Sequence, residues 1–293
     1  MLLALDIGGT KLAAAWVEAG VIVERRQCAM AYDEAGFKRA IDGLVKGWPE
    51  PQQVAVATTG YIDEGRVRSV NLDIIPFWNG FALGEVLRQR FLCDIRLIND
   101  AQAAAWGEYL IRQKTEALNH PANLLFITLS TGVGGGLVLD HQLRIGPHGL
   151  AGHVGHAGVR LKPLDDVPRC GCGRHGCLEM IASGTSLARQ ASVIFRRPLN
   201  SAELFLLAHQ GDVQAESIIN HAAIAVAEAI GGFHMIVDLS EVVIGGSVGL
   251  AAGMLARIRV ALENMRLPSP PLLSAAMLGA DAGLSGVIAW GGQ

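Results

Sequence analysis

The sequence predicts an α/β protein made of two similar half-domains that face each other across a bound nucleotide. Two glycine-containing turns, at residues 8–10 and 130–136, each join one apolar strand to another. Strand-like and helix-like segments alternate along the chain, and 293 residues are enough for two separate cores. Because both halves begin with the same strand–turn–strand unit, we expect a duplicated architecture that differs from a Rossmann domain.

The first half is expected to begin with three strands joined by tight turns. Its apolar segments predict strands over 2–7, 12–17, 21–26, 54–58 and 94–98, and a helix over 33–46. The last of these strands runs into Asn99 and Asp100, after which an alanine-rich segment predicts a helix over 101–111. Ligands of open α/β sheets bind where strands end, so Asn99 and Asp100 are candidate site residues.

The second half is expected to repeat this order after a hinge. Residues 112–123 are polar and include Pro121, which favours a hinge between the halves. A strand, the glycine turn, a second strand, a turn near Asp140 and a third strand then follow. Further along we expect helices over 178–195, 202–209 and 213–231, a strand over 241–244, and a last helix over 282–290 that packs back on the first half.

The composition favours a soluble enzyme. A hydrophobic fraction of 51% with 17% charged residues indicates extensive burial, and a net charge of −3 provides no basic field for a polyanion. No run of about 18 consecutive apolar residues and no basic, apolar leader are found, so neither a membrane span nor a signal peptide is expected. We therefore expect a cytoplasmic protein that binds neither nucleic acid nor membrane.

The glycine-containing turns are predicted to bind phosphate oxygens. Glycine lets the backbone approach an anion closely, and exposed N–H groups at such a turn can bind it without a cationic side chain. The alternative is an ordinary hairpin turn. The chain has no P-loop motif, and residues 132–136 do not fit G-x-G-x-x-G because Leu137 stands where the third glycine should be.

Three of the five cysteines predict a metal site. Cys28 and Cys93 stand singly among apolar residues and are expected to be inert core thiols. The segment from Cys170 to Cys177, in contrast, places three thiols and several glycines in one short loop. With His153 or His156 as a fourth ligand, this favours a structural zinc site over a reduced thiol loop, and four protein ligands disfavour catalytic zinc.

Five motifs occur in an order that resembles the ROK family of sugar kinases. They are residues 6–11, residues 99–101, residues 130–136, the G-x-x-G-H motif at 152–156, and the cysteine loop with Glu179. The resemblance spans nearly the whole chain. It implies an actin/hexokinase-like (ribonuclease H-like) two-domain ATPase fold with an interdomain cleft, and a homodimer. The implied domains are 1–117 plus 281–293, a small α/β domain, and 118–280, a large one with the zinc loop.

The resemblance also implies a role for each motif. Asp100 is the base that accepts the sugar hydroxyl proton, whereas from the residues alone it could be only a helix N-cap. The implied sugar contacts are Thr59, Gly60, Asn71, Asn99, Asp100, His153 and Glu179. The implied ATP and Mg²⁺ site comprises Asp6, Ile7, Gly8, Gly9, Thr10, Lys11, Thr131, Gly132, Val133, Gly134, Gly135, Gly245, Gly246 and Ser247. The last three could equally form a simple strand-to-helix turn. The implied zinc ligands are His156, Cys170, Cys172 and Cys177.

The G-x-x-G-H motif points to a substrate. Glucose-specific members usually carry Glu at its first variable position, whereas His153 stands here, as in the bacterial N-acetylmannosamine kinases. The implied reaction is ATP-dependent phosphorylation of this small-molecule sugar at O6, and the alternative is a glucokinase or mannokinase. Sugar-sensing repressors of the family carry a DNA-binding segment ahead of the phosphate motif, but Asp6 lies near the first residue, so a regulator is disfavoured.

Overall fold

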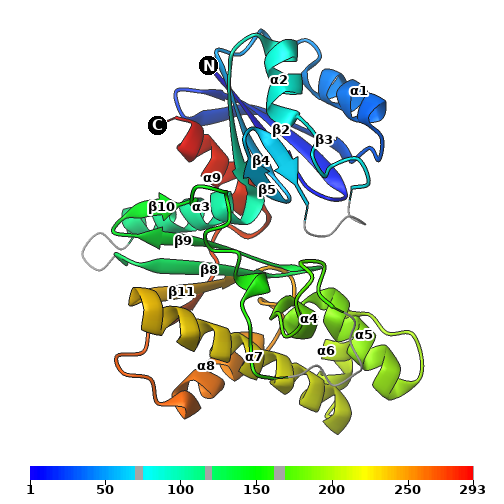
Figure 1. The fold of residues 1–293 in the computed structure, drawn as a ribbon, viewed down its shortest axis with the longest axis vertical. Helices are drawn as coiled ribbons and strands as arrows, with labels where there is room; N and C mark the ends of the chain where they lie inside the picture. The colour runs from blue at the N-terminus through cyan, green and yellow to red at the C-terminus, as the bar shows by residue number, and fades with distance from the viewer. Residues whose placement is uncertain (70–74, 116–120, 162–168, 293) are drawn as a thin grey trace.

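Two five-stranded sheets of corresponding order form the frame of the molecule (Figure 1). This computed structural model describes residues 1–69, 75–115, 121–161 and 169–292. The first sheet has the order β3-β2-β1-β4-β7 and the second β10-β9-β8-β11-β12. In each sheet the first three strands pair antiparallel and the other two add in parallel. The predicted duplication is therefore confirmed.

The first sheet is covered by helices on both faces. Its strands are β1 (Leu2–Ile7), β2 (Lys11–Glu18), β3 (Val21–Ala29), β4 (Gln53–Thr58) and β7 (Asp94–Asn99). Leu3, Leu5 and Ile7 point to one face and share a core with α1 (Glu34–Val45) and α2 (Leu83–Phe91). Alternate residues of β1, Ala4 and Asp6, face the opposite side, where Ala4 packs with α3 (Asp100–Thr115) and α9 (Ala282–Gly291). The last helix thus packs on the first half, as predicted.

The second sheet shares α3 with the first. Its strands are β8 (Leu124–Leu129), β9 (Val133–Leu139), β10 (Gln142–Arg144), β11 (Glu241–Gly245) and β12 (Leu272–Ala275). One face packs on helices α4 (Glu179–Ala182), α5 (Gly184–Phe195), α6 (Ser201–His209), α7 (Val213–Val237) and α8 (Met254–Met265). On the other face Phe126 and Val138 pack on Trp106 and Tyr109 of α3. Figure 1 shows α3 and α9 lying between the two sheets.

The helices α3 and α9 cross with their backbones in contact. A Cβ atom at Gly286 would lie 1.7 Å from the Ala103 carbonyl oxygen, and one at Gly107 would lie 3.0 Å from the Ala282 carbonyl oxygen. Only glycine permits so close an approach at these two positions. The junction of the two halves is therefore a tightly packed helix pair.

The hinge predicted over 112–123 is wrong at its start, because α3 continues to Thr115. Arg112 is buried and pairs with Glu108 at 2.5 Å and with Glu241 of β11 at 3.0 Å. Glu108 also accepts hydrogen bonds from the backbone N–H groups of Met277 (3.0 Å) and Leu278 (2.8 Å). Met277 and Leu278 connect β12 to α9, so one buried charge cluster ties this connection to α3.

The sequence also missed or merged several elements. The helix predicted over 178–195 is two helices, since Ser183 is extended (φ −71°, ψ 154°) and its side chain caps α5. The hairpin β5 (Tyr61–Asp63) and β6 (Arg66–Arg68), helices α2 and α8, and strand β12 were not predicted. Two short 3₁₀ turns, η1 (Val154–His156) and η2 (Gly279–Asp281), complete the described elements.

Helix α7 extends six residues beyond its predicted end, to Val237. Among the described residues it alone is long and apolar enough to cross a membrane, by length and composition only. Within the structure 61% of its apolar window is buried. A core helix of a soluble protein passes the same test, and α7 contributes many residues to the core of the second half.

Candidate active site and metal centre

Asn99 and Asp100 lie where β7 ends and α3 begins. The Asn99 carbonyl Oδ1 accepts from the N–H groups of Ala101 (3.0 Å) and Gln102 (3.1 Å), so Asn99 caps the helix. Asp100 Oδ1 accepts from the same Ala101 N–H (2.8 Å) and from Asn99 Nδ2 (3.0 Å). Burial raises the pKa of the Asp100 carboxyl. Capping thus falls mainly to Asn99, and Asp100 is a half-buried, oriented acid–base group.

Asp6 lies at the end of β1, beneath the start of α9. A Cβ atom at Gly283 would be 3.5 Å from Asp6 Oδ2. Burial, and then the charge of Asp100, raise the pKa of Asp6 to about 6, although Lys11 and Arg25 oppose the shift. Asp281 adds a third negative charge and pairs with Arg25 at 2.6 Å. A half-buried carboxylate among like charges fits a bound cation such as Mg²⁺.

The two predicted phosphate turns join β1 to β2 and β8 to β9, at corresponding positions in the two sheets. Gly8 N–H donates to the Lys11 carbonyl at 2.9 Å, and Ser130 N–H donates to the Gly132 carbonyl at 2.9 Å. The third glycine segment packs against the second turn, since Ser247 Oγ lies 3.3 Å from Ser130 Oγ. Gly245 pairs with Thr128 and Gly246 lies against the Leu129 carbonyl, so this segment borders the end of β8 and the start of the turn.

Gly134 and Gly135 lie within β9 and have close neighbours of their own. A Cβ atom at Gly134 would be 2.9 Å from Ala101 Cβ, and one at Gly135 would be 2.6 Å from the Gly152 carbonyl oxygen. The packing of α3 and of the 152–154 loop on β9 is enough to require these glycines. Their presence is thus explained without a phosphate contact.

Glu179, the first residue of α4, is bound to the second phosphate turn. Its Oε2 accepts from the Val133 N–H at 3.0 Å. A Cβ atom at Gly132 would lie only 2.8 Å from the same oxygen. The predicted sugar residue Glu179 and the predicted phosphate residues Gly132 and Val133 are therefore in direct contact.

His153 lies in a loop that docks on α3. Gln102, which is 1% exposed, donates through Nε2 to the carbonyl oxygens of Ala151 (2.8 Å) and Gly149 (3.2 Å). Burial, and then the charge of His156, lower the pKa of His153 to about 4, so the ring is neutral near pH 7. Its buried Nδ1 has no hydrogen-bond partner among the described residues. A buried polar atom without a partner calls for an explanation, and a bound ligand or water that completes its hydrogen bonding is one.

Thr59 and Gly60 continue from the end of β4. Thr59 N–H donates to the Ile7 carbonyl at 3.0 Å, and the Gly60 carbonyl accepts from Asn99 Nδ2 at 2.7 Å. Both thus lie beside Asn99 and Asp100. The predicted sugar residue Asn71 lies outside the described residues.

His156, Cys170, Cys172 and Cys177 come together as a metal-binding set, with all four ligand atoms within 4.8 Å of one another. His156 Nδ1 lies 3.4 Å from Cys170 Sγ, and Cys172 Sγ lies 3.4 Å from Cys177 Sγ. Ligand atoms around tetrahedral zinc are about 3.8 Å apart for Zn–S bonds of about 2.3 Å. The four residues therefore fit zinc, with His156 rather than His153 as the fourth ligand.

Several site neighbours were not found from the sequence. They are Tyr61, Gln102 and Asp281. Each acts through a partner distant along the chain, as when Asp281 pairs with Arg25 or Gln102 holds residues 149–151. Only Asp281, directly before the alanine- and glycine-rich start of α9, stands at a position that the sequence pattern could have singled out.

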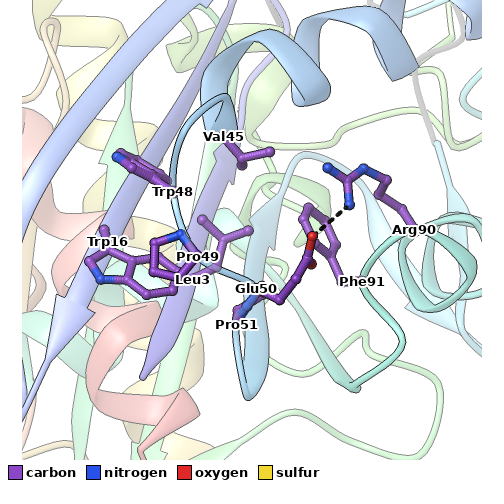
Figure 2. A pocket seen from close by; sticks show the side chains of 9 residues that line it. All are labelled: Leu3, Trp16, Val45, Trp48, Pro49, Glu50, Pro51, Arg90 and Phe91. Atoms are coloured by element: carbon purple, nitrogen blue, oxygen red, sulfur yellow. Dashed lines mark ion pairs between the residues drawn. The ribbon is translucent and has the colours of Figure 1, made fainter.

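A small hollow in the first half lies away from these residues (Figure 2). It has a volume of about 20 Å³, room for about one water molecule. Trp16 and Trp48 line it with ring centroids 6.0 Å apart, and Arg90 pairs with Glu50 across it at 3.7 Å. Because Leu3 and Pro51 place it near the amino ends of β1 and β4, it is at the opposite end of the sheet from Asp6 and is not part of the candidate site.

Comparison with known proteins identifies the family. A family model described as the ROK family matches residues 2–293. The chain belongs to the ROK family. It is 40% identical over 265 residues to an N-acetylmannosamine kinase of Vibrio cholerae, covering 89% of each chain. It is 39% identical over 296 residues to an N-acetylmannosamine kinase of Yersinia pseudotuberculosis, covering 98% of this chain and 97% of the relative.

Solved ROK structures confirm the predicted fold class. A ROK hexokinase from Thermus thermophilus superposes with a TM-score of 0.82 at 30% identity, covering 98% of this chain and 96% of that one. A ROK family glucokinase from Streptomyces griseus, solved with glucose and AMPPNP, gives a TM-score of 0.78 at 29% identity, covering 100% and 99%. The chain therefore has the two-domain actin/hexokinase-like fold of ROK sugar kinases.

Proposed function

We propose that this chain is a sugar kinase that transfers the γ-phosphoryl group of ATP to O6 of N-acetylmannosamine, giving N-acetylmannosamine 6-phosphate. The observation that carries the proposal is the near full-length similarity to relatives named N-acetylmannosamine kinase. The half-buried Asp100 at the carboxyl end of β7 supplies the chemistry that a kinase needs.

Asp100 acts as the general base in this proposal. Phosphoryl transfer depends mainly on positioning and on electrostatic stabilisation, so a single oriented carboxylate is sufficient on the sugar side. The hydrogen bonds from Ala101 N–H and Asn99 Nδ2 fix the Asp100 carboxylate. The raised pKa makes it a better proton acceptor for the sugar hydroxyl. Proton transfer to Asp100 then leaves the sugar O6 free to attack the γ-phosphorus, and the bond from this phosphorus to the bridging oxygen breaks to release ADP.

The nucleotide lies between the two turns in this proposal. We assign Asp6 to the Mg²⁺ ion, which neutralises phosphate charge when it is bound. The amides of residues 9–10 and 131–132 would hold phosphate oxygens, and Gly245, Gly246 and Ser247 would border the adenosine. The glucokinase from Streptomyces griseus, solved with AMPPNP, supports nucleotide binding in this family.

His153 carries the choice of sugar in this proposal. A neutral imidazole accepts one hydrogen bond and donates another, whereas a carboxylate only accepts. An N-acetyl group offers a carbonyl that needs a donor, which His153 supplies and Glu does not. We assign Thr59, Gly60, Asn71, Asn99 and Glu179 to the other sugar contacts. A glucokinase is the second candidate, favoured by the solved glucokinase neighbour.

We infer a structural zinc ion held by His156, Cys170, Cys172 and Cys177. It would fix the segment between η1 and α4, and so the backbone that presents His153 and Glu179. We further propose that residues 1–117 with 281–293 and residues 118–280 are the two domains, and that the protein is a cytoplasmic homodimer.

A coupled ATP assay tests the function. We expect kcat/KM for N-acetylmannosamine to exceed kcat/KM for glucose and for mannose. The His153→Glu variant should lower the ratio of the N-acetylmannosamine value to the glucose value by roughly 10- to 200-fold, which would narrow or reverse the preference. If the unmodified protein prefers glucose, the N-acetylmannosamine kinase proposal is wrong and the glucokinase function takes its place. Absence of phosphorylation with any hexose or N-acetylhexosamine would refute both.

A further inference from the structure

Tyr61, which no motif singled out, contacts His153. It is the first residue of β5, directly after Gly60, and lies in the first half of the molecule. Its ring lies edge-on to the His153 imidazole, with centroids 6.4 Å apart and an interplanar angle of 86°. Edge-to-face geometry is a favoured arrangement of aromatic rings. One side-chain contact therefore joins the two halves beside the orphaned His153 Nδ1.

The backbone on the Tyr61 side of this contact is firmly held. The Thr59 carbonyl accepts from Trp78 Nε1 at 3.2 Å, and the Gly60 carbonyl accepts from Asn99 Nδ2 at 2.7 Å. Gly60 has a φ of +87°, and a Cβ atom there would lie 2.6 Å from the Arg68 carbonyl oxygen. The start of β5 therefore has little freedom, and the Tyr61 ring projects from a fixed point.

The backbone on the His153 side rests on the same hairpin. Gly149 has a φ of +70°, and a Cβ atom there would lie 2.7 Å from the Ile62 carbonyl oxygen. Gln102 holds this loop from the opposite side through the Gly149 and Ala151 carbonyl oxygens. With both backbones fixed, the remaining freedom is rotation of the His153 ring about its side-chain bonds.

Rotation of the His153 ring decides which of its atoms a ligand meets. The two ring nitrogens differ, since one donates and the other accepts in the neutral ring. Nδ1 has no hydrogen-bond partner among the described residues, whereas a hydrogen-bond interaction with the Leu150 backbone raises the pKa of the ring against the effect of burial. The Tyr61 ring is the aromatic neighbour of the imidazole, and edge-to-face contact of this kind favours one relative orientation of the two rings.

We propose that Tyr61 is a positioning residue that holds the His153 imidazole in the orientation in which it binds the N-acetyl group, and so sets the sugar preference. The inference rests on the proposed function. It goes beyond that function because it assigns a determinant of sugar specificity to Tyr61 in the first half of the molecule, whereas the G-x-x-G-H motif lies in the second half.

The test measures kcat and KM for N-acetylmannosamine and glucose in single variants. Tyr61→Leu should lower the ratio of the two kcat/KM values by about 2- to 12-fold, the range of an aromatic pair. The loss should appear as a raised KM for N-acetylmannosamine with kcat nearly unchanged. Tyr61→Phe keeps the ring and should keep the ratio. Tyr32→Leu, at an exposed tyrosine elsewhere in the first half, is the matched control.

A double variant shows whether Tyr61 acts through His153. In a His153→Gln background, Tyr61→Leu should change the ratio by less than about 2-fold, because coupled residues are non-additive. An equal effect in both backgrounds would overturn the proposal, and so would a Tyr61→Phe variant as impaired as Tyr61→Leu. Failure of the unmodified protein to phosphorylate N-acetylmannosamine would instead reject the proposed function. Zinc content and unfolding midpoints confirm that each variant is folded.

Discussion

Replacing Asp6 with Asn should stabilise the protein at neutral pH while it removes activity. Burial, and then the neighbouring Asp100 charge, raise the pKa of Asp6 to about 6 from a reference value of 3.8. The folded state therefore disfavours the ionised carboxylate. Below the reference value both states are protonated and no penalty exists, and the penalty grows as pH rises through the folded pKa. In a site that binds a cation, this destabilisation of the folded protein is present only while the cation is absent.

The size of the effect follows from the shift. About two pKa units correspond to about 3 kcal/mol at pH well above 6. Integration of the titration gives about 1.6 kcal/mol near pH 5, so the penalty should grow by about 1.4 kcal/mol between pH 5 and 8. The unfolding free energy of Asp6→Asn minus that of the unmodified protein should grow by this amount, because Asn does not ionise.

Urea unfolding at a series of pH values, without Mg²⁺ or nucleotide, measures this difference. Comparing the two proteins at each pH cancels any effect of the zinc loop common to both. Asp94→Asn is the control, since the Asp94 side chain is 67% exposed on the same sheet. Added Mg²⁺ and nucleotide should stabilise the unmodified protein more than the variant. A difference that stays constant with pH, or that falls as pH rises, would refute the reasoning.

Three further outcomes are expected. Asp100→Asn should lower kcat by about 10² to 10⁴ with sugar binding retained, as equilibrium binding and steady-state kinetics together will show. A variant with near-normal kcat would leave Asp100 only a structural role. Cys172→Ala should purify with less than about half an equivalent of zinc and lose activity, whereas Cys93→Ala should retain both, as metal analysis will show. Full activity of unmodified protein without zinc would reject the zinc site. Glu108→Gln should cost about 3–5 kcal/mol in urea unfolding, since it leaves the buried Arg112 undercompensated, and a loss below about 1 kcal/mol would contradict this.

The elements predicted well are those with strong local patterns. Continuous apolar segments located β1 and β4, and the repeated glycine turns revealed the duplication that the two sheet orders confirm. The spacing of Cys170, Cys172 and Cys177 likewise predicted a cluster that the structure brings together. In these cases residues near in sequence determine the geometry.

The predictions that failed depend on contacts between distant residues. From the sequence, Arg112 is assigned to the start of a polar linker. Its partner Glu241 lies 129 residues away, so no local pattern shows that Arg112 is buried and paired. The break at Ser183 is set by its capping of Ser186 N–H at 3.0 Å and by contact of Gly184 with the Ser130 carbonyl. Tyr61 could not be singled out, because its aromatic partner is in the other half.

Helix α3 explains how residues from both halves can act on one reaction. It begins at Asp100, packs on the first sheet through Ala103 and on the second through Trp106, and carries the Glu108–Arg112 cluster near its end. Eight residues of helix separate Asp100 from Glu108, about 12 Å along a rigid rod. The second sheet presents Glu179 and His153 through the cysteine loop and the docked 149–153 segment. Because α3 contacts β8 and β9 directly, the proposed base keeps a fixed position relative to the second phosphate turn as well as to its own sheet.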